Sequence, residues 1–326
     1  YFTRRGENRI EQRVFFPKGS TAKAYGIENN LKELDSTTCK RIADICQLRL
    51  MNEYSKKDYL GKVYIDKELK NYIAPMSQRT ASKSLKSVAR GSKMPIDEDT
   101  NVLRHFVYWK NNDYRVDVDL SVVAYNEDFE MLTNVYYCHL KDSQYGLVHS
   151  GDFVSSYGEG ATEYIDIDIN KARLNGVRYL AVVINNFTND FFSDMEDCFM
   201  GFMYRDNAQS GEVFDARTVV NKTDITAEST QVVSTIIDLE EMAIYWADLP
   251  LTSSTGLNNI NSNQSGIGYT LKSILNICKP NLYDLIEMNA LARGELVFSR
   301  EEADVVFALD GDITPYDTDI IVSEYL

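Results

Sequence analysis

The chain has 326 residues, of which 44% are hydrophobic and 25% are charged, and its formal net charge is −15. This composition is typical of a globular protein with a sizeable core, and no stretch approaches the roughly 18 consecutive apolar residues that a membrane span needs. The five cysteines are scattered and form no CxxC pair, which argues against a disulfide framework and a metal–thiolate site. Nothing resembles a secretory signal, so we expect a cytoplasmic protein, and because the chain begins at Tyr1 we expect a fragment or a processed form.

Charge is distributed unevenly along the chain. Residues 1–115 hold 23 Lys and Arg against 14 Asp and Glu, a balance of +9, whereas residues 116–326 hold 11 against 35, a balance of −24. A basic third followed by an acidic two thirds predicts parts with opposite surface fields, which can attract each other or attract different partners.

The first hundred residues predict a basic α/β segment, residues 1–100. Residues 36–54 place apolar side chains at helical spacing after a Ser or Thr cap, and residues 60–66 are typical of a short strand. Residues 77–93 are compatible with a helix and carry five basic and no acidic residues. The polar, proline-containing residues 92–100 are expected to be a connector that ends this segment.

The middle of the chain, residues 101–251, predicts an antiparallel β-sandwich and therefore a mainly β fold. In residues 115–125 apolar side chains alternate with Asp117, Asp119 and Ser121, which is the period of a strand with two different faces. Many short strands separated by polar turns favour a sandwich over βαβ units. The expected strands are 102–109, 115–125, 134–140, 163–169, 177–184, 198–204, 231–239 and 242–249.

The end of the chain predicts a linker and a small helical C-terminal segment. Residues 252–268 are rich in Ser, Asn and Gly and are expected to be a flexible linker or loop. Residues 269–326 predict two helices interrupted at Pro280, a short strand and turn over 303–312, and a terminal helix that begins at Pro315.

Catalytic and nucleotide-binding motifs are absent from the sequence. It contains no GxSxG, HExxH, GxxxxGK[ST] or GxGxxG motif, and we assign the three histidines, His105, His139 and His149, to packing, backbone hydrogen bonds or the surface. A carboxylate-based hydrolase stays an alternative, because an acidic sandwich can bring two carboxylates together in a cleft.

The stretch HSGDFVSSYGEGATEYIDIDI, residues 149–169, predicts metal ligands. Ca²⁺ takes about six to eight oxygen ligands from carboxylates and from carbonyls of tightly folded loops. Asp117 and Asp119 are a second source of oxygens. The alternative is that each carboxylate faces water, as we expect of Asp166 and Asp168 in the strand that ends the stretch. The candidate ligands within the stretch are Asp152, Glu159 and Glu163, with Gly151, Gly158 and Gly160 allowing the backbone to fold tightly.

Three motifs in order, DVDLSVVAYN (117–126), the stretch 149–169 and GVRYLAVVINN (176–186), resemble the TerD family, which is associated with bacterial tellurite resistance and stress response. The resemblance covers about residues 102–250. It implies a β-sandwich that binds Ca²⁺ between acidic loops and has no established enzymatic activity. The ligands that it implies are Asp117 or Asp119, together with Asp152, Glu159 and Glu163, and with Gly158 as a carbonyl donor.

This chain departs from the family pattern at one place. Where the family tends to show Gly-Asp-Asp-Glu, the sequence has Gly160, Ala161, Thr162 and Glu163, so two acidic positions are absent. Since Ca²⁺ affinity follows ligand charge, we expect fewer ions, weaker binding or a vestigial site. The loop 185–198 lies nearby in the family arrangement and is expected either to supply missing oxygens, to contact a partner, or to form an acidic hairpin. Its candidate supporting ligands are Asn185, Asn186, Asp190 and Asp194.

The basic run predicts a second binding surface. On a helix, Arg79, Lys83, Lys86, Arg90 and Lys93 form one stripe, which can neutralise phosphates of a nucleic acid or of another phosphorylated ligand. The competing interpretation is that the stripe docks on the acidic sandwich of the same or a neighbouring subunit. We therefore expect a cytoplasmic, bacterial-type, non-enzymatic Ca²⁺-binding protein, a binding or scaffold component whose partners are other stress-response proteins or its own subunits. Nucleic-acid binding is the alternative.

Overall fold

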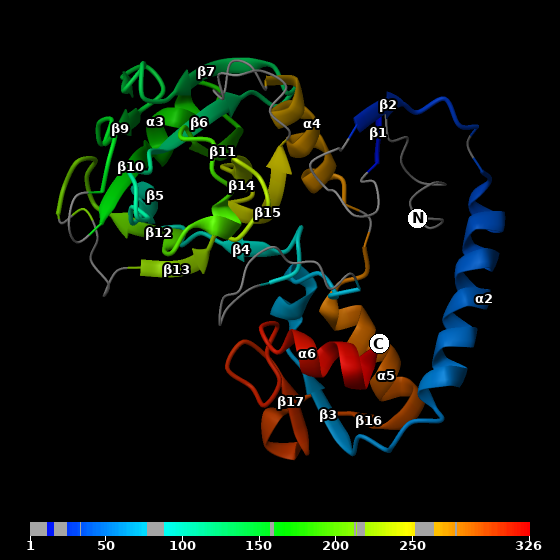
Figure 1. Cartoon of the computed structure of the whole chain (residues 1–326). Helices are drawn as coiled ribbons and strands as arrows, with labels where there is room; N and C mark the ends of the chain where they lie inside the picture. The colour runs from blue at the N-terminus through cyan, green and yellow to red at the C-terminus, as the bar shows by residue number, and fades with distance from the viewer. Residues whose placement is uncertain are drawn as a thin grey trace.

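The fold is mainly β, as predicted, and is built around two six-stranded antiparallel sheets (Figure 1). The first sheet has the order β13-β12-β5-β10-β9-β8 and the second has the order β4-β15-β14-β11-β6-β7. The computed structural model describes residues 12–15, 25–32, 34–76, 88–156, 160–211, 213, 219–251, 264–277 and 279–326.

The strands of the first sheet are β5 (Val102–Trp109), β8 (Lys141–Asp142), β9 (Leu147–His149), β10 (Ala161–Asp168), β12 (Cys198–Arg205) and β13 (Val219–Asp224). Those of the second sheet are β4 (Lys93–Pro95), β6 (Val118–Tyr125), β7 (Met131–Val135), β11 (Tyr179–Asn186), β14 (Gln231–Asp238) and β15 (Ala243–Leu251). Short elements between them are α3 (Ile169–Leu174) and η3 (Phe192–Asp194).

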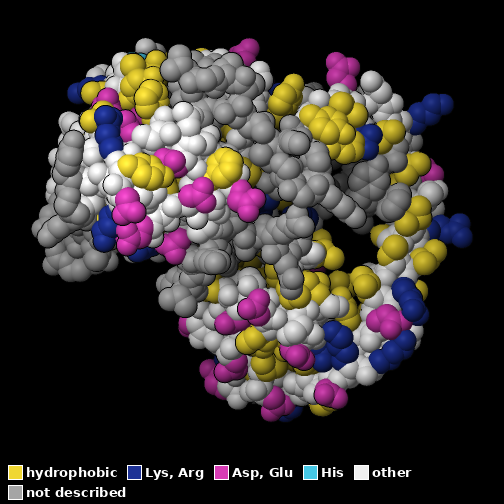
Figure 2. Space-filling model, viewed as in Figure 1, with side chains coloured by type: hydrophobic (Ala, Val, Ile, Leu, Met, Phe, Trp, Pro, Cys, Tyr) yellow, Lys and Arg dark blue, Asp and Glu magenta, His cyan; other side chains and the backbone are white. Residues whose placement is uncertain are grey.

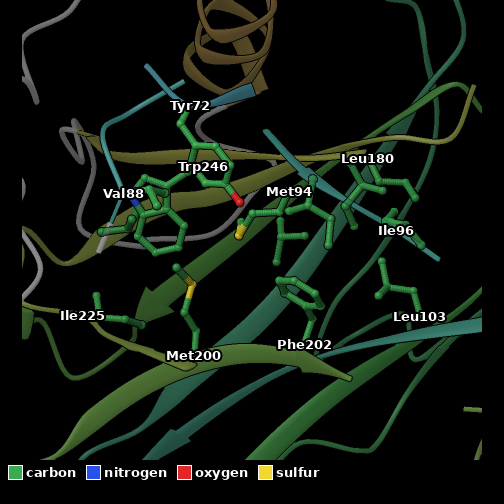
Figure 3. Close-up of a cluster of buried hydrophobic side chains, with 14 of the residues drawn as sticks. Tyr72, Val88, Met94, Ile96, Leu103, Leu180, Met200, Phe202, Ile225 and Trp246 are labelled. Atoms are coloured by element: carbon green, nitrogen blue, oxygen red, sulfur yellow. The ribbon is translucent and has the colours of Figure 1, made fainter. Parts of the chain in front are cut away.

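The main core lies between the two sheets. Leu103 and Phe202 of the first sheet and Leu180 of the second are almost fully buried there (Figure 3). Tyr72 and Val88, which precede the sandwich in the chain, lie beside Trp246 in the same cluster. Burial of such side chains stabilises the fold by about 25 cal/mol per Å² of apolar surface removed from water. The sandwich core therefore includes residues from the N-terminal segment.

The outer face of the second sheet is covered as well. Helix α4 (Gln264–Leu275) packs on β14 and β15, and its Ile267 and Leu271 join a second buried cluster with Val123 and Val183 of the sheet. Both faces of β6 and β11 are consequently buried over their whole length.

The N-terminal and C-terminal segments form one small α/β unit (Figure 1). Strand β3 (Lys62–Ile65) pairs in parallel with β16 (Glu295–Leu296) and β17 (Val305–Phe307). Helix α5 (Leu282–Arg293) packs on this sheet, on η2 (Lys67–Asn71) and on α2 (Ser36–Tyr54). The remaining elements are β1 (Gln12–Phe15), β2 (Tyr25–Glu28), η4 (Arg300–Glu302), α6 (Thr318–Ile320) and η5 (Ile321–Tyr325).

The expected connector, linker and third strand of the sandwich differ from the structure. Residues expected to be a connector contain β4, because Met94 and Ile96 are buried and Lys93–Pro95 pairs with β15. Helix α4 begins at Gln264, inside the expected linker, while residues 252–263 lie outside the described residues. The strand expected over 134–140 is β7, which ends at Val135. The domain boundaries at 100, 251 and 268 stay predictions.

Asp166 was expected to face solvent, and this prediction is wrong. Its carboxylate is fully buried on the outer face of the first sheet and accepts two hydrogen bonds from Arg104, from Nε at 2.6 Å and from Nη2 at 2.8 Å. Asp168 is half-buried and caps α3 by accepting from the backbone N–H of Lys171. Among the described residues, no helix combines the length and the apolar character needed to cross a membrane.

Candidate metal centre

Three of the predicted ligands come together at one end of the sandwich. Asp117 immediately precedes β6, Asp119 lies within it, and Asp152 lies in the segment between β9 and β10. One carboxylate oxygen from each of the three lies within 4.8 Å of the others. Asp117 and Asp119 are each only 5% exposed, whereas Asp152 is exposed. The group is therefore open to water on the side of Asp152.

The charges in this group are poorly compensated by the protein itself. Burial, followed by the negative charges of Glu163 and Asp117, raises the pKa of Asp119 to about 7. Burial also raises the pKa of Asp117, although Arg115 opposes this effect through a hydrogen bond of 2.9 Å from Nη2 to Oδ2. A bound divalent cation would remove this repulsion and favour the ionised carboxylates.

The chemistry of the group fits a hard cation. All three side chains offer carboxylate oxygens, which Ca²⁺ and Mg²⁺ prefer, and the group includes no cysteine or histidine ligand. With one oxygen from each carboxylate, the group supplies three of the about six to eight oxygens that Ca²⁺ takes, so second carboxylate oxygens, water or another ligand would complete the shell.

Glu163 is buried beside this group but is not a member of it. Its Oε2 accepts the backbone N–H of Leu120 at 2.8 Å, and its Oε1 accepts the backbone N–H of Phe153 at 3.0 Å. These donors belong to the residues that directly follow Asp119 and Asp152. Glu163 thus fixes the backbone beside two of the three carboxylates, a role that the sequence did not reveal.

His149 is buried in the same network and does not lie at the surface, which was one of the positions expected for the histidines. The backbone N–H of Gly151 donates to its Nδ1 at 3.1 Å, so Nδ1 carries a lone pair and Nε2 carries the proton. Nε2 donates to the carbonyl of Leu120 at 3.0 Å and lies 3.4 Å from Glu163 Oε2. Gly151 has a φ of +120°, a conformation that favours glycine and that turns the chain between His149 and Asp152.

Sequence reasoning also missed Arg115. Its guanidinium donates to Asp117 and, through Nε, to the carbonyl of Val154 at 2.6 Å, so it links the segment before β6 to the segment that carries Asp152. The available signal was its position two residues before Asp117, which places both side chains on the same side of an extended chain.

The other candidate ligands occupy different positions. Asn185 pairs with Asp119 in the β6–β11 register and its Nδ2 donates to Asp119 Oδ2 at 3.3 Å. Asn186 instead accepts the backbone N–H of Thr188 and so shapes the turn after β11. The carboxylates of Asp190 and Asp194 do not belong to the group of three. Gly158 and Glu159 lie outside the described residues.

The expected helix over residues 77–93 is wrong for its described part, because residues 88–92 are not helical and Lys93 begins β4; this part contacts the sandwich. Arg90 Nε donates to the carbonyl of Ala247 at 2.8 Å, and its Nη2 lies 3.6 Å from Asp248 Oδ2. Lys93 pairs with Glu241 at 2.5 Å. Arg79, Lys83 and Lys86 lie outside the described residues.

Comparisons with known proteins agree with part of this picture. No family model matches the chain. Over 84 residues the chain is 29% identical to the tellurium resistance protein TerZ of Serratia marcescens, and this match spans 26% of the chain and 43% of TerZ. The crystal structure of a homologue of the telluride resistance protein TerD from Streptomyces coelicolor A3(2) is 12% identical, with a TM-score of 0.38, over 47% of this chain and 92% of that one. Part of the chain is thus similar in sequence to a tellurium-resistance protein.

Proposed function

We propose that this protein is a non-enzymatic, TerD-type stress-resistance component that binds Ca²⁺ through Asp117, Asp119 and Asp152. The observation that carries the proposal is the convergence of three carboxylate oxygens within 4.8 Å, two of them from side chains that are 5% exposed. Burying like charges this close together is costly unless a cation offsets them. The similarity to TerZ, which is named for tellurium resistance, supports the wider role.

In this proposal the surrounding residues position the three carboxylates. Glu163 and His149 hold the backbone after Asp119 and before Asp152, and Arg115 holds the Asp152 segment against Asp117. Asn185 donates to one oxygen of Asp119, which orients that carboxylate. When bound, Ca²⁺ would supply the positive charge that the group lacks.

The contacts of the basic run support docking on the sandwich of the same chain more than nucleic-acid binding. Both described members, Arg90 and Lys93, already contact acceptors of the sandwich. The carboxylate-based hydrolase stays a prediction.

Calorimetric titration of the chelator-stripped protein with Ca²⁺, and in parallel with Mg²⁺, tests the metal proposal. We expect heat of binding and thermal stabilisation with Ca²⁺, because a ligand that binds only the folded state stabilises it. Asp152→Asn removes one negative charge from the group at an exposed position and should strongly weaken both signals, because Ca²⁺ affinity follows the charge of its ligands. Asp113→Asn, the same change at an exposed residue outside the group, is the matched control. Absence of heat and of stabilisation at millimolar Ca²⁺ would overturn the proposal.

A further inference from the structure

Helix α2 is only partly packed on the described part of the protein. It runs for 19 residues, from a cap in which Asp35 accepts the backbone N–H of Thr38, along one side of the molecule (Figure 1). Only Cys39 and Tyr54, near its two ends, are buried, and its contacts include α5. In proteins most of the stability of a helix comes from an apolar face that packs against a partner.

The most exposed apolar side chains of α2 point away from its attachment to the protein. Ile45 is 67% exposed and Leu48 is 68% exposed. At about 100° per residue, their mean direction lies roughly 180° from that of Cys39 and Tyr54. Figure 2 shows hydrophobic side chains exposed along this side of the molecule, between Lys and Arg side chains. The outward face of α2 therefore has an apolar centre without a described neighbour that buries it.

The pattern on this outward face is that of a short heptad seam. Thr38, Arg41, Ile45, Leu48 and Asn52 follow each other at spacings of three, four, three and four, and all five are exposed. These spacings correspond to alternating a and d positions, with Ile45 and Asn52 at a and Leu48 at d. Seams of this kind pack against another helix.

We propose that α2 pairs with α2 of a second copy of this chain as a short parallel coiled coil. Isoleucine at a with leucine at d favours a parallel coiled coil of two helices, and a single asparagine at a fixes the register of the two helices. In that register Asp44, at g, lies opposite Arg49, at e, of the other copy, so the flanking charges are complementary, and Arg49 also pairs with Glu53 of its own helix at 2.6 Å. Arg41 at a d position limits the apolar seam to its centre, so the dimer is weak and reversible.

The proposal does not depend on the metal site, because α2 and the three carboxylates lie in different units of the fold. Sedimentation equilibrium of the full chain, from low to high micromolar concentration and with chelator present, measures the association directly. We expect a monomer–dimer equilibrium. Leu48→Lys should weaken it by roughly tenfold or more, since lysine keeps helix propensity and removes a seam contact.

The matched control is Leu174→Lys, which makes the same change at a leucine that is 86% exposed on α3. This variant should dimerise like the unmodified chain. Charge reversal supplies a second check, because Asp44→Arg should weaken the dimer and the combination of Asp44→Arg with Arg49→Asp should restore it. A chain that stays monomeric at the highest concentration, or a Leu48→Lys variant that dimerises normally, would overturn the proposal.

Disulfide trapping tests the parallel orientation. In a chain with Cys46→Ser and Cys138→Ser, the change Leu48→Cys should give a rapid cross-link between copies under mild oxidation, because equal d positions face each other in a parallel pair. Gln47→Cys, one residue away and off the seam, should cross-link slowly. Equal cross-linking at both positions, or cross-linking only when Ile45→Cys is mixed with Leu48→Cys, would contradict the parallel arrangement.

Discussion

Two aspartate-bearing strands of the sandwich show how the neighbouring strand decides the role of a carboxylate. Asp166 of β10 lies opposite Arg104 of β5, which meets both of its oxygens. Asp119 of β6 lies opposite Asn185 of β11, which donates one hydrogen bond and brings no positive charge. Both carboxylates are buried, but the first meets an arginine within the fold whereas the second meets only an amide across the strand, and in our proposal a bound cation offsets its charge.

Arg104→Met should have the largest effect on stability, because it breaks the buried ion pair with Asp166. It leaves Asp166 buried without its cation, and loss of one partner of a buried ion pair costs about 3–5 kcal/mol. Urea denaturation should show this loss of unfolding free energy. The double change Arg104→Met with Asp166→Leu should recover most of it, because two apolar side chains replace both charges. A single variant that loses less than about 1 kcal/mol would mean that the pair is not buried as described.

Glu163→Gln should have the next largest effect. Both carboxylate oxygens accept backbone N–H groups, whereas a glutamine side chain has only one oxygen and its amide would face one of these donors. We expect a loss of about 1–3 kcal/mol in unfolding free energy. We also expect weaker Ca²⁺ binding, although Glu163 is outside the group of three, because the segments that carry Asp119 and Asp152 loosen.

Glu196→Gln is the control for this prediction, since it makes the same change at an exposed residue of the next loop. It should leave stability and Ca²⁺ affinity close to those of the unmodified chain. If Glu163→Gln lost stability but kept full Ca²⁺ affinity, its positioning role would be wrong.

Asp119→Asn should increase the unfolding free energy of the chelator-stripped protein, whereas Arg104→Met and Glu163→Gln should decrease it. Burial and neighbouring carboxylates disfavour the charged form of Asp119 and raise its pKa to about 7, so above pH 7 the neutral amide should stabilise the chelator-stripped protein by about 1 kcal/mol or more. The same change should reduce the stabilisation by Ca²⁺, because the group loses one of its negative charges. Thermal unfolding with chelator and with Ca²⁺ measures both effects, and a variant less stable under both conditions would contradict the account.

The sequence predicted the sandwich well because its signals are local. Residues 102–109 are strand β5 as expected, and helix α2 spans the expected residues 36–54. Local patterns could not predict that Asp117, Asp119 and Asp152 lie close together, because these residues belong to segments that are separated in the chain. Only the order of the three motifs indicated it.

Cross-strand register could not be predicted in the same way. Asp166 and Asp119 both sit in alternating runs of aspartate and apolar residues, and only the neighbouring strand distinguishes a solvated, a paired and an uncompensated carboxylate. The parallel pairing of β3 with β16 and β17 was missed for the same reason, since it joins segments more than two hundred residues apart.

His105 extends the comparison to a buried group with no charged partner among the described residues. It lies between the sheets, where its Nε2 is 3.2 Å from Thr235 Oγ1, and burial lowers its pKa from 6.5 to about 3. Between these values the unfolded chain binds a proton that the folded chain does not, so unfolding free energy should fall as the pH drops below 6.5, by at most about 1.4 kcal/mol per pH unit.

His105→Gln keeps a polar group that can reach Thr235 and removes this titration. Its unfolding free energy, measured by urea denaturation from neutral pH downward, should fall less steeply than that of the unmodified chain. His139→Gln, at an exposed histidine, is the control and should keep the original slope because it leaves His105 in place. Identical slopes for all three chains would show that the acid sensitivity comes from other groups, such as the carboxylates paired with arginine.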